Sequence, residues 1–144
     1  MLKCKPIVIA LDLEGTLISN AVSQIPRPGL YPFLQFCHKN FCRLVIFTAV
    51  NELRFRNIAR TLADLGEVPC WFVALEYIKW DGEYKDLSFV PGVDSRQVLL
   101  IDDREEYVKP EQKEQWIYIS GYEYPYPKDD YELEKLVHKL SLIN

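Results

Sequence analysis

Residues 7–16 read Ile7-Val8-Ile9-Ala10-Leu11-Asp12-Leu13-Glu14-Gly15-Thr16, a continuous apolar run followed directly by a polar turn. β-Branched residues favour strands, and a short apolar run without alternation is typical of a strand that is buried on both faces. Strands of this kind belong to parallel sheets that are covered by helices. We therefore predict that residues 7–11 form the first strand of an α/β domain, with Asp12 at its carboxyl end.

Working outward from this strand, four more short apolar runs indicate further strands, and three amphipathic segments indicate helices. Asn51 is a favoured N-cap for the second helix, and Gly66 is a favoured stop. The alternation predicts a Rossmann-like, three-layer α/β/α fold around a central, mainly parallel five-stranded sheet. The predicted strands are residues 7–11, 44–47, 71–73, 98–101 and 116–119, and the predicted helices are residues 30–39, 52–65 and 130–142.

Two segments fall outside this alternation. Trp80-Asp81-Gly82-Glu83 contains Asp-Gly, which favours a type I′ turn, so we expect a small hairpin insertion. Residues 121–128 form a Tyr/Pro loop, whose rings either make a recognition platform or pack against one another. No repeat, linker or low-complexity tract divides the chain, so residues 1–144 are expected to form one domain.

The formal net charge of −4 argues against nucleic acid or an anionic membrane as the main partner, and no apolar run is long enough to span a bilayer. The N-terminus lacks the pattern of a secretory signal. The four cysteines, at positions 4, 37, 42 and 70, include no Cys-x-x-Cys pair, so a zinc site is not expected. They lie in or beside apolar stretches, where we expect reduced, buried thiols and hence a cytoplasmic location.

Polar side chains collect at one edge of the predicted sheet. In a parallel α/β sheet, ligands bind outside the carboxyl ends of the strands. Carboxylates, a hydroxyl and an ammonium that converge on one edge indicate phosphoryl transfer. The residues expected at this edge are Asp12, Glu14, Thr48, Lys85, Asp102 and Asp103.

Asp12 suits the role of nucleophile, because an aspartyl-phosphate splits one difficult displacement into two easier ones. A Mg²⁺ held by Asp12 and the Asp102/Asp103 pair would screen the carboxylates from the anionic phosphate, and hard cations prefer oxygen ligands. Glu14 would protonate the leaving oxygen and then deprotonate the attacking water.

Donors on neighbouring elements would hold the phosphate itself. The Thr48 hydroxyl and the Lys85 ammonium would orient and neutralise its equatorial oxygens. Gly15 lets the chain turn sharply, so that backbone N–H groups face the anion. Lys79, across the predicted hairpin, is the alternative candidate to Lys85.

Four stretches, in this order, resemble the motifs of the haloacid dehalogenase (HAD) superfamily. Asp12-Leu13-Glu14-Gly15-Thr16-Leu17 resembles its first motif, and Phe47-Thr48-Ala49 resembles its second. Tyr84-Lys85-Asp86-Leu87-Ser88 resembles the third, and Val98-Leu99-Leu100-Ile101-Asp102-Asp103 resembles the fourth. The last two are similar to those of the NLI-interacting-factor-like branch, the small phosphatases that act on the C-terminal domain of RNA polymerase II.

The resemblance implies a HAD-like Rossmann sheet, bound Mg²⁺ and hydrolysis through an aspartyl-phosphate. It implies that the metal is held by Asp12, by the main-chain carbonyl of Glu14 and by Asp103, with Asp102 close by. The residues that it implies for phosphate binding are Gly15, Thr16, Thr48, Ala49 and Lys85.

The chain departs from the first motif at Glu14, where the superfamily usually has aspartate. The extra methylene displaces the carboxylate, so a catalytically weak binding or phospho-switch module is an alternative function. A receiver domain is disfavoured, because receivers carry their acidic pair after the first strand, whereas this chain carries it after the fourth predicted strand.

The windows in which a lid would be inserted are short. Residues 17–28 are too few for a folded cap, and residues 65–85 offer only a strand and a hairpin. We therefore expect an essentially capless site that accepts a phosphate projecting from a macromolecule such as a phosphoprotein. A phosphatase of small metabolites or nucleotides is the alternative.

Overall fold

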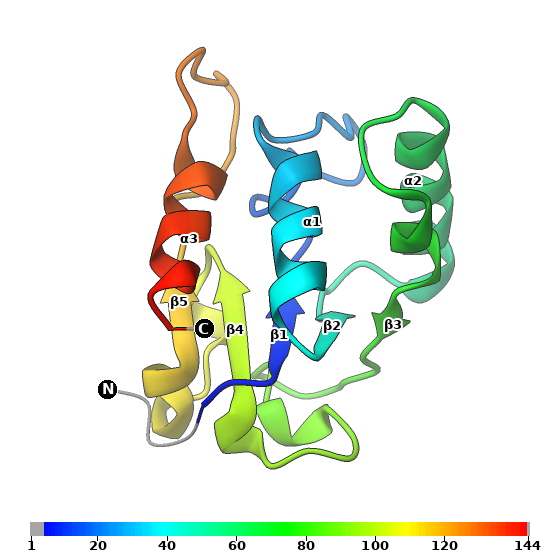
Figure 1. Cartoon of the computed structure of the whole chain (residues 1–144). Helices are drawn as coiled ribbons and strands as arrows, with labels where there is room; N and C mark the ends of the chain where they lie inside the picture. The colour runs from blue at the N-terminus through cyan, green and yellow to red at the C-terminus, as the bar shows by residue number, and fades with distance from the viewer. Residues whose placement is uncertain (1–4, 144) are drawn as a thin grey trace.

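The computed structural model describes residues 5–143 and contains five strands: β1 Val8–Leu11, β2 Arg43–Ile46, β3 Glu76–Tyr77, β4 Val98–Asp102 and β5 Trp116–Tyr118. They form one parallel sheet in the order β3-β2-β1-β4-β5. The central strand β1 pairs Val8 with Arg43 of β2 and with Val98 of β4. The predicted five-stranded sheet is confirmed, and all its carboxyl ends share one edge (Figure 1).

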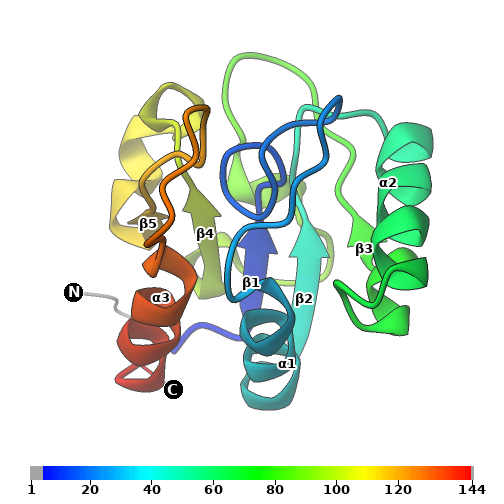
Figure 2. The same ribbon diagram turned by 90° about the horizontal axis from the view of Figure 1, so that it is seen from above.

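Three α-helices follow the predicted pattern: α1 Leu30–Asn40, α2 Glu52–Asp64 and α3 Glu132–Ser141. α1 and α3 pack against each other on one face of the sheet, and α2 lies on the β3 side (Figure 2). Asn51 caps α2, as expected, by accepting a hydrogen bond of 2.9 Å from the Arg54 N–H. The helices close one core against side chains of the sheet that include Ile9, Leu11, Leu44, Ile46, Leu99 and Ile101.

Loops and short 3₁₀ turns, instead of α-helices, cover the opposite face of the sheet. The connections that cross this face contain Pro91, Gly92 and Pro110, and both residue types interrupt α-helices. The third layer of the predicted sandwich is therefore built from η2 Leu87–Phe89, η3 Ser95–Gln97, η4 Glu105–Tyr107 and η5 Pro110–Gln115. Its core contacts with the sheet come from Ile78, Leu87, Val90 and Val108.

The prediction of a strand at residues 71–73 was wrong. These residues belong to a 3₁₀ helix, η1 Cys70–Ala74, and the third strand is β3. A short apolar run is compatible with either state. Here Phe72 turns inward and packs on Phe55 of α2, with ring centroids 5.5 Å apart, so burial against the helix determines the local structure.

The predicted hairpin was also wrong. Within residues 5–143, no pair of strands forms a hairpin around Asp81-Gly82, and residues 78–86 form a loop. The indole N–H of Trp80 donates a hydrogen bond of 2.8 Å to the carbonyl of Thr48, which holds this loop against the end of β2. A tertiary contact thus replaces the ladder that the Asp-Gly turn signal predicted.

The thiols are less uniformly buried than expected. Cys37 is buried, and burial raises its pKa to about 12. Cys42 and Cys70 are exposed, so the expectation of burial was wrong for these two, and Cys4 lies outside the described residues. In the part of the chain that the structure describes, no helix is long and apolar enough to cross a membrane.

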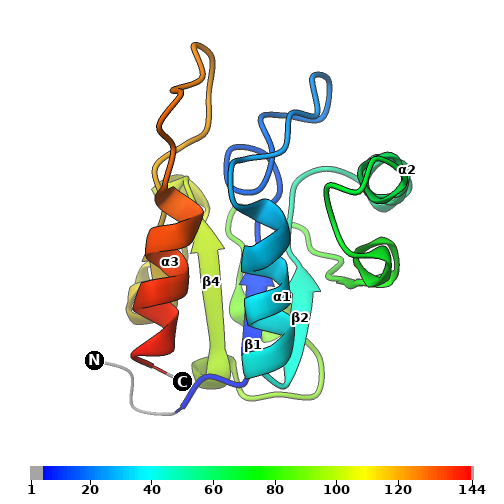
Figure 3. The same cartoon turned by 45° about the horizontal axis from the view of Figure 1, so that its top comes forward.

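Two loops rise above the carboxyl ends of the central strands. Residues 12–28 follow β1 and residues 119–130 follow β5, and both lie on the same side of the molecule (Figures 1 and 3). The Tyr122 N–H donates a hydrogen bond of 2.8 Å to the carbonyl of Gly15, which joins the two loops. Together they frame the edge at which the sequence predicts the site.

Candidate active site

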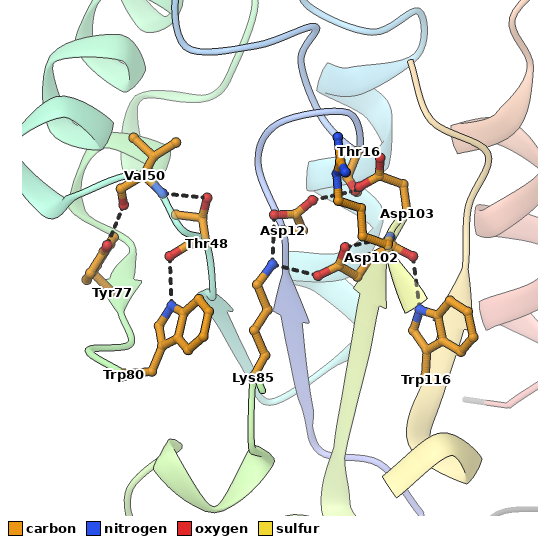
Figure 4. Close-up of polar contacts among 11 residues, drawn as sticks. Asp12, Thr16, Thr48, Val50, Tyr77, Trp80, Lys85, Asp102, Asp103 and Trp116 are labelled. Carbon is orange, nitrogen blue, oxygen red and sulfur yellow. Dashed lines mark hydrogen bonds and ion pairs between the residues drawn. The ribbon is translucent and has the colours of Figure 1, made fainter. Parts of the chain in front are cut away.

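Three carboxylates meet where β1 and β4 end side by side (Figure 4). Asp12 follows β1, Asp102 is the last residue of β4, and Asp103 comes next. Each offers one oxygen, and the three oxygens lie within 4.8 Å of one another. Asp12 and Asp102 are buried and Asp103 is half-buried, so their charges repel one another in a poorly solvated environment.

Lys85 lies beneath this cluster and is only 1% exposed. Its ammonium donates hydrogen bonds to Asp12 Oδ1 at 2.9 Å and to Asp102 Oδ2 at 2.6 Å, and it lies 4.9 Å from the ring centroid of Tyr107. Burial by itself lowers the pKa of Lys85, but the two carboxylates raise it above its ordinary value. Lys85 therefore stays charged and neutralises the carboxylates from below.

The single positive charge of Lys85 does not balance the negative charges of three carboxylates. Burial and the charge of Asp12 raise the pKa of Asp102 to about 6 and that of Asp103 to about 7. Both oxygens of Asp102 already accept protein donors, from Lys85 and from the Arg104 N–H at 2.9 Å. The carboxylate of Asp103 lies 3.4 Å from the Thr16 hydroxyl, whose single proton is held more closely by Asp12, so Asp103 is the better placed of the pair to bind a cation.

The loop after Asp12 is bent so tightly that its third residue must be glycine. Gly15 has φ +77°, and a Cβ atom there would lie 2.4 Å from Asp103 Oδ2. Its N–H donates to the Ile18 carbonyl at 2.7 Å, which closes the bend. The Thr16 hydroxyl donates to Asp12 Oδ2 at 3.0 Å, so Thr16 orients the carboxylate of Asp12 from within the buried side of the loop.

The same loop leaves two backbone donors without partners. Within residues 5–143, the N–H groups of Leu13 and Glu14 donate no hydrogen bond, although the neighbouring N–H groups all do. The Glu14 carboxylate accepts a hydrogen bond of 2.7 Å from the Ala21 N–H, which fixes its direction. Free N–H groups at a tight turn form an anion-binding concavity.

Thr48 stands two residues beyond the end of β2. Its hydroxyl oxygen accepts a hydrogen bond of 3.2 Å from the Val50 N–H, and its carbonyl accepts the Trp80 indole N–H. The Tyr77 hydroxyl donates in turn to the Val50 carbonyl. These contacts fix Thr48 and leave its hydroxyl proton available to a ligand (Figure 4).

A pocket of about 450 Å³ opens over Asp12. Six predicted site residues line it, whereas Thr16, Lys85 and Asp102 lie below its wall. A second pocket of about 410 Å³, beside Trp80 and Lys79, shares Thr48 and Ala49 with the first. The lining of the first pocket comprises the predicted residues Asp12, Glu14, Gly15, Thr48, Ala49 and Asp103, together with Ser19, Asn20, Arg104, Tyr107, Glu123, Tyr124 and Tyr126.

Residues 7–144 match the model of the NLI interacting factor-like phosphatases. The chain belongs to this family. The predicted branch is thereby confirmed, and with it the assignment as a phosphatase of the HAD superfamily, whose substrate carries a phosphoryl group. The carboxylates of Asp12, Asp102 and Asp103 are consistent with the active site of such an enzyme. No curated protein sequence matches the chain.

Sequence reasoning missed two groups of residues in this NLI interacting factor-like phosphatase. Arg104 directly follows the acidic pair, Tyr107 stands four residues after Asp103, and both line the pocket. Arg27 and Asp130, both buried, form an ion pair of 3.0 Å beneath the loop of Gly15. These two are 103 positions apart, and no local pattern indicates that they meet.

Proposed function

We propose that this protein is a Mg²⁺-dependent phosphomonoester hydrolase that forms an aspartyl-phosphate on Asp12. The observation that supports it best is the state of the Asp12 carboxylate. It lines an open pocket while Lys85 donates to one of its oxygens and Thr16 to the other. Two donors, one on each oxygen, fix the orientation of this carboxylate at the pocket, as a nucleophile requires.

The donors around Asp12 fit a hard divalent cation. Asp12, Asp102 and Asp103 bring carboxylate oxygens within 4.8 Å of one another, and Mg²⁺ prefers oxygen ligands. We propose that Asp12, Asp103 and the main-chain carbonyl of Glu14 would hold the ion. The raised pKa of Asp103 marks a carboxylate that is short of positive charge, which a cation would supply. When bound, Mg²⁺ lowers the repulsion between the carboxylates and an anionic phosphate and stabilises the charge of the transferring group.

The chemistry divides into two displacements. Asp12 attacks phosphorus, the bond from phosphorus to the ester oxygen breaks, and Glu14 gives its proton to that leaving oxygen. Glu14 then takes a proton from water, the water oxygen attacks phosphorus, and the bond from phosphorus to Asp12 breaks. Inorganic phosphate leaves, and Asp12 and Glu14 return to their starting protonation states.

The phosphoryl oxygens would be bound by groups that face the pocket. The Thr48 hydroxyl and the free N–H group of Glu14 serve as donors, and Gly15 and Ala49 keep the wall open. Lys85 acts from below, since its charge is shared between Asp12 and Asp102. Asp102 holds Lys85 and the turn at Arg104 in place.

An open site favours a large substrate. The pocket over Asp12 and the second pocket lie side by side at Thr48 and Ala49, and no inserted domain is present between β1 and β4 within residues 5–143. A lid normally supplies water exclusion and contact area to an enzyme of small metabolites. We therefore propose a macromolecular, phosphoprotein-like substrate, acted on in the cytoplasm by residues 1–144 as one domain.

The test is turnover of p-nitrophenyl phosphate with Mg²⁺, before and after removal of the metal with EDTA. Wild-type protein should be active, EDTA should abolish activity reversibly, and Asp12→Asn should be inactive. Thr48→Ala should lose roughly 10²-fold in rate, as removal of one charge-stabilising donor does elsewhere. Its control is Thr61→Ala, whose hydroxyl donates to the Asn57 carbonyl on the exposed face of α2.

The second candidate is a catalytically weak binding module. It is favoured by Glu14, whose longer side chain occupies the position of the usual aspartate and is already engaged by the Ala21 N–H. Stoichiometric labelling of Asp12 without turnover, or phosphate binding without labelling, would support this module and contradict the hydrolase. Near-wild-type turnover by Asp12→Asn would contradict the mechanism itself.

A further inference from the structure

Three tyrosines stand in the wall of the pocket that contains Asp12. Tyr107 belongs to η4, and Tyr124 and Tyr126 belong to the loop after β5. The Tyr126 ring lies 4.9 Å from that of Tyr122 and 5.9 Å from that of Tyr124, so the rings form a ladder. Its inner end, Tyr122, is buried and bonded through its N–H to the Gly15 carbonyl. The ladder is thus fixed to the loop that carries the nucleophile.

The outer end of the ladder is left to solvent. Tyr124 is 83% exposed, and its ring contacts Tyr126 edge to face. A ring that is this exposed adds little to the stability of the fold, because burial is what stabilises an apolar side chain. Its free face is available to a second ring, and aromatic pairs of this kind are attractive beyond the area that they bury.

The charges of the residues that line the pocket further restrict the class of ligand that it can bind. The described residues that line this pocket include four carboxylates, from Asp12, Glu14, Asp103 and Glu123, but only one cation, Arg104. Arg104 is itself shared with carboxylates, at 3.4 Å from Glu106 and 3.9 Å from Glu123. A polyanion such as an oligonucleotide meets net repulsion here, since stacking platforms for nucleic acids rely on basic grooves. A single phosphate on an uncharged carrier brings only its own charge, which the Mg²⁺ proposed above would offset.

We infer that the tyrosine wall is a subsite for a planar aromatic group that carries one phosphate, as in a phosphotyrosine side chain. The inference rests on the proposed function, because it places the phosphate at Asp12. The ring of the substrate would contact Tyr124 and Tyr126. The leaving oxygen would then be the phenolic oxygen of that ring, and Glu14 would protonate it in the first displacement. The carrier protein extends out of the open side of the pocket.

The test separates ring recognition from leaving-group reactivity by using phosphonates, which the enzyme does not hydrolyse. Binding of phenylphosphonate and of methylphosphonate is measured by calorimetry with Mg²⁺ present, so that turnover is not needed. Wild-type protein should bind phenylphosphonate roughly tenfold more tightly, as two aromatic contacts allow. Tyr124→Ala and Tyr126→Leu should each lose at least threefold of this preference while binding methylphosphonate as before.

The matched control is Tyr118→Ala, since Tyr118 is an exposed tyrosine of β5 that does not line the pocket. It should keep the full preference, and melting temperatures should show that each variant folds. Equal binding of both phosphonates by wild-type protein would overturn the inference, as would tighter binding of a 5′-phosphorylated oligonucleotide. A different result would contradict the proposed function: phenyl phosphate, phosphotyrosine peptides and phosphoserine peptides would all be bound, but none would be hydrolysed.

Discussion

The guanidinium of Arg27 forms a two-pronged ion pair with Asp130, in which Nε and Nη2 each lie 3.0 Å from one carboxylate oxygen. The remaining nitrogen, Nη1, donates to the carbonyl of Gly15 at 3.0 Å. Both side chains are buried, and the ring of Tyr122 lies over the guanidinium at 5.3 Å. The segment before α3 is thereby connected to the loop that carries Asp12, so the end of the chain supports the site.

We expect Arg27→Met to lower the free energy of unfolding by about 3–5 kcal/mol, because it leaves the Asp130 carboxylate buried without its charged partner. Denaturant unfolding gives this value. The control is Arg43→Met, which removes the half-exposed pair with Glu76 and should cost about 1 kcal/mol or less. Equal losses in the two variants would contradict the role assigned to the buried pair.

The close approach of Gly15 to Asp103 predicts a specific defect in Gly15→Ala. Gly15 and Gly92 share nearly the same backbone, at φ +77° and +75°, so alanine suffers the same strain of about 1–2 kcal/mol at both. At Gly15 the new Cβ also meets Asp103 Oδ2 at 2.4 Å, whereas at Gly92 nothing lies within 4 Å. Gly15→Ala should therefore lose phosphatase activity as well as stability.

Gly92→Ala should lose stability but keep its activity. The comparison is made by measuring kcat/KM of both variants with p-nitrophenyl phosphate, well below their melting temperatures. If Gly15→Ala retained full activity, the contact with Asp103 would not constrain the site.

Asp86, directly after Lys85, predicts a pH-dependent term in stability. Burial raises its pKa, but hydrogen bonds from the Ser88 N–H, Lys109 and Gln112 hold the pKa well below its ordinary value. Since the folded-state pKa is the lower one, this contribution is present above the unfolded pKa of about 3.9 and is lost as the pH falls through the folded value. Asp86→Asn should therefore destabilise the protein most at pH 7, and by progressively less as the pH falls below about 3.9.

Unfolding free energies of both proteins at several pH values test this. Asp94→Asn is the control, because Asp94 accepts a similar bond from the Arg96 N–H at the fully exposed start of η3. The free energy of unfolding should change less in Asp94→Asn than in Asp86→Asn across the pH range. A loss in Asp86→Asn that did not depend on pH would point to packing instead of charge.

The parts of the site that sequence predicted follow from topology. Asp12, Thr48 and the Asp102-Asp103 pair each stand at or just after the carboxyl end of a strand, and parallel strands bring those ends to one edge. β3 was not predicted because its two residues are only half-buried and lack the apolar run of an inner strand. The 3₁₀ layer was not predicted because contacts between its turns fix it, such as the hydrogen bond of 2.9 Å from the Leu87 N–H to the Gln112 side chain, and local periodicity does not contain such contacts.

The burial of Lys85 beneath the carboxylates was also not predicted from the sequence. Its motif placed it near Asp12, yet the sequence does not distinguish a lysine that faces the pocket from one that lies beneath the carboxylates. That distinction depends on the loop at residues 78–86 and on the backbone bond from Lys85 to the Tyr107 carbonyl, at 2.8 Å. The pairing of Arg27 with Asp130 is likewise a product of the folded chain alone.

Glu14 carries the last prediction, since it is the residue in which this chain departs from the HAD motif. Its carboxylate is positioned by the Ala21 N–H at 2.7 Å, and the amide oxygen of Gln accepts the same bond. Glu14→Gln should therefore keep the shape of the pocket while losing both proton transfers. Activity should fall by roughly 10²–10⁴-fold, the usual contribution of general acid–base catalysis.

The fate of the phosphoryl group distinguishes this role from a structural one. With p-nitrophenyl phosphate, whose leaving group departs without a proton, Glu14→Gln should still phosphorylate Asp12 and then hydrolyse the adduct slowly. A burst of p-nitrophenol close to one per protein, followed by slow turnover, is the expected result. Glu14→Asp keeps an ionisable carboxylate and should turn over without a burst. Unchanged steady-state turnover in Glu14→Gln would remove Glu14 from proton transfer, because the amide has no acidic proton to give and no basic oxygen with which to activate water.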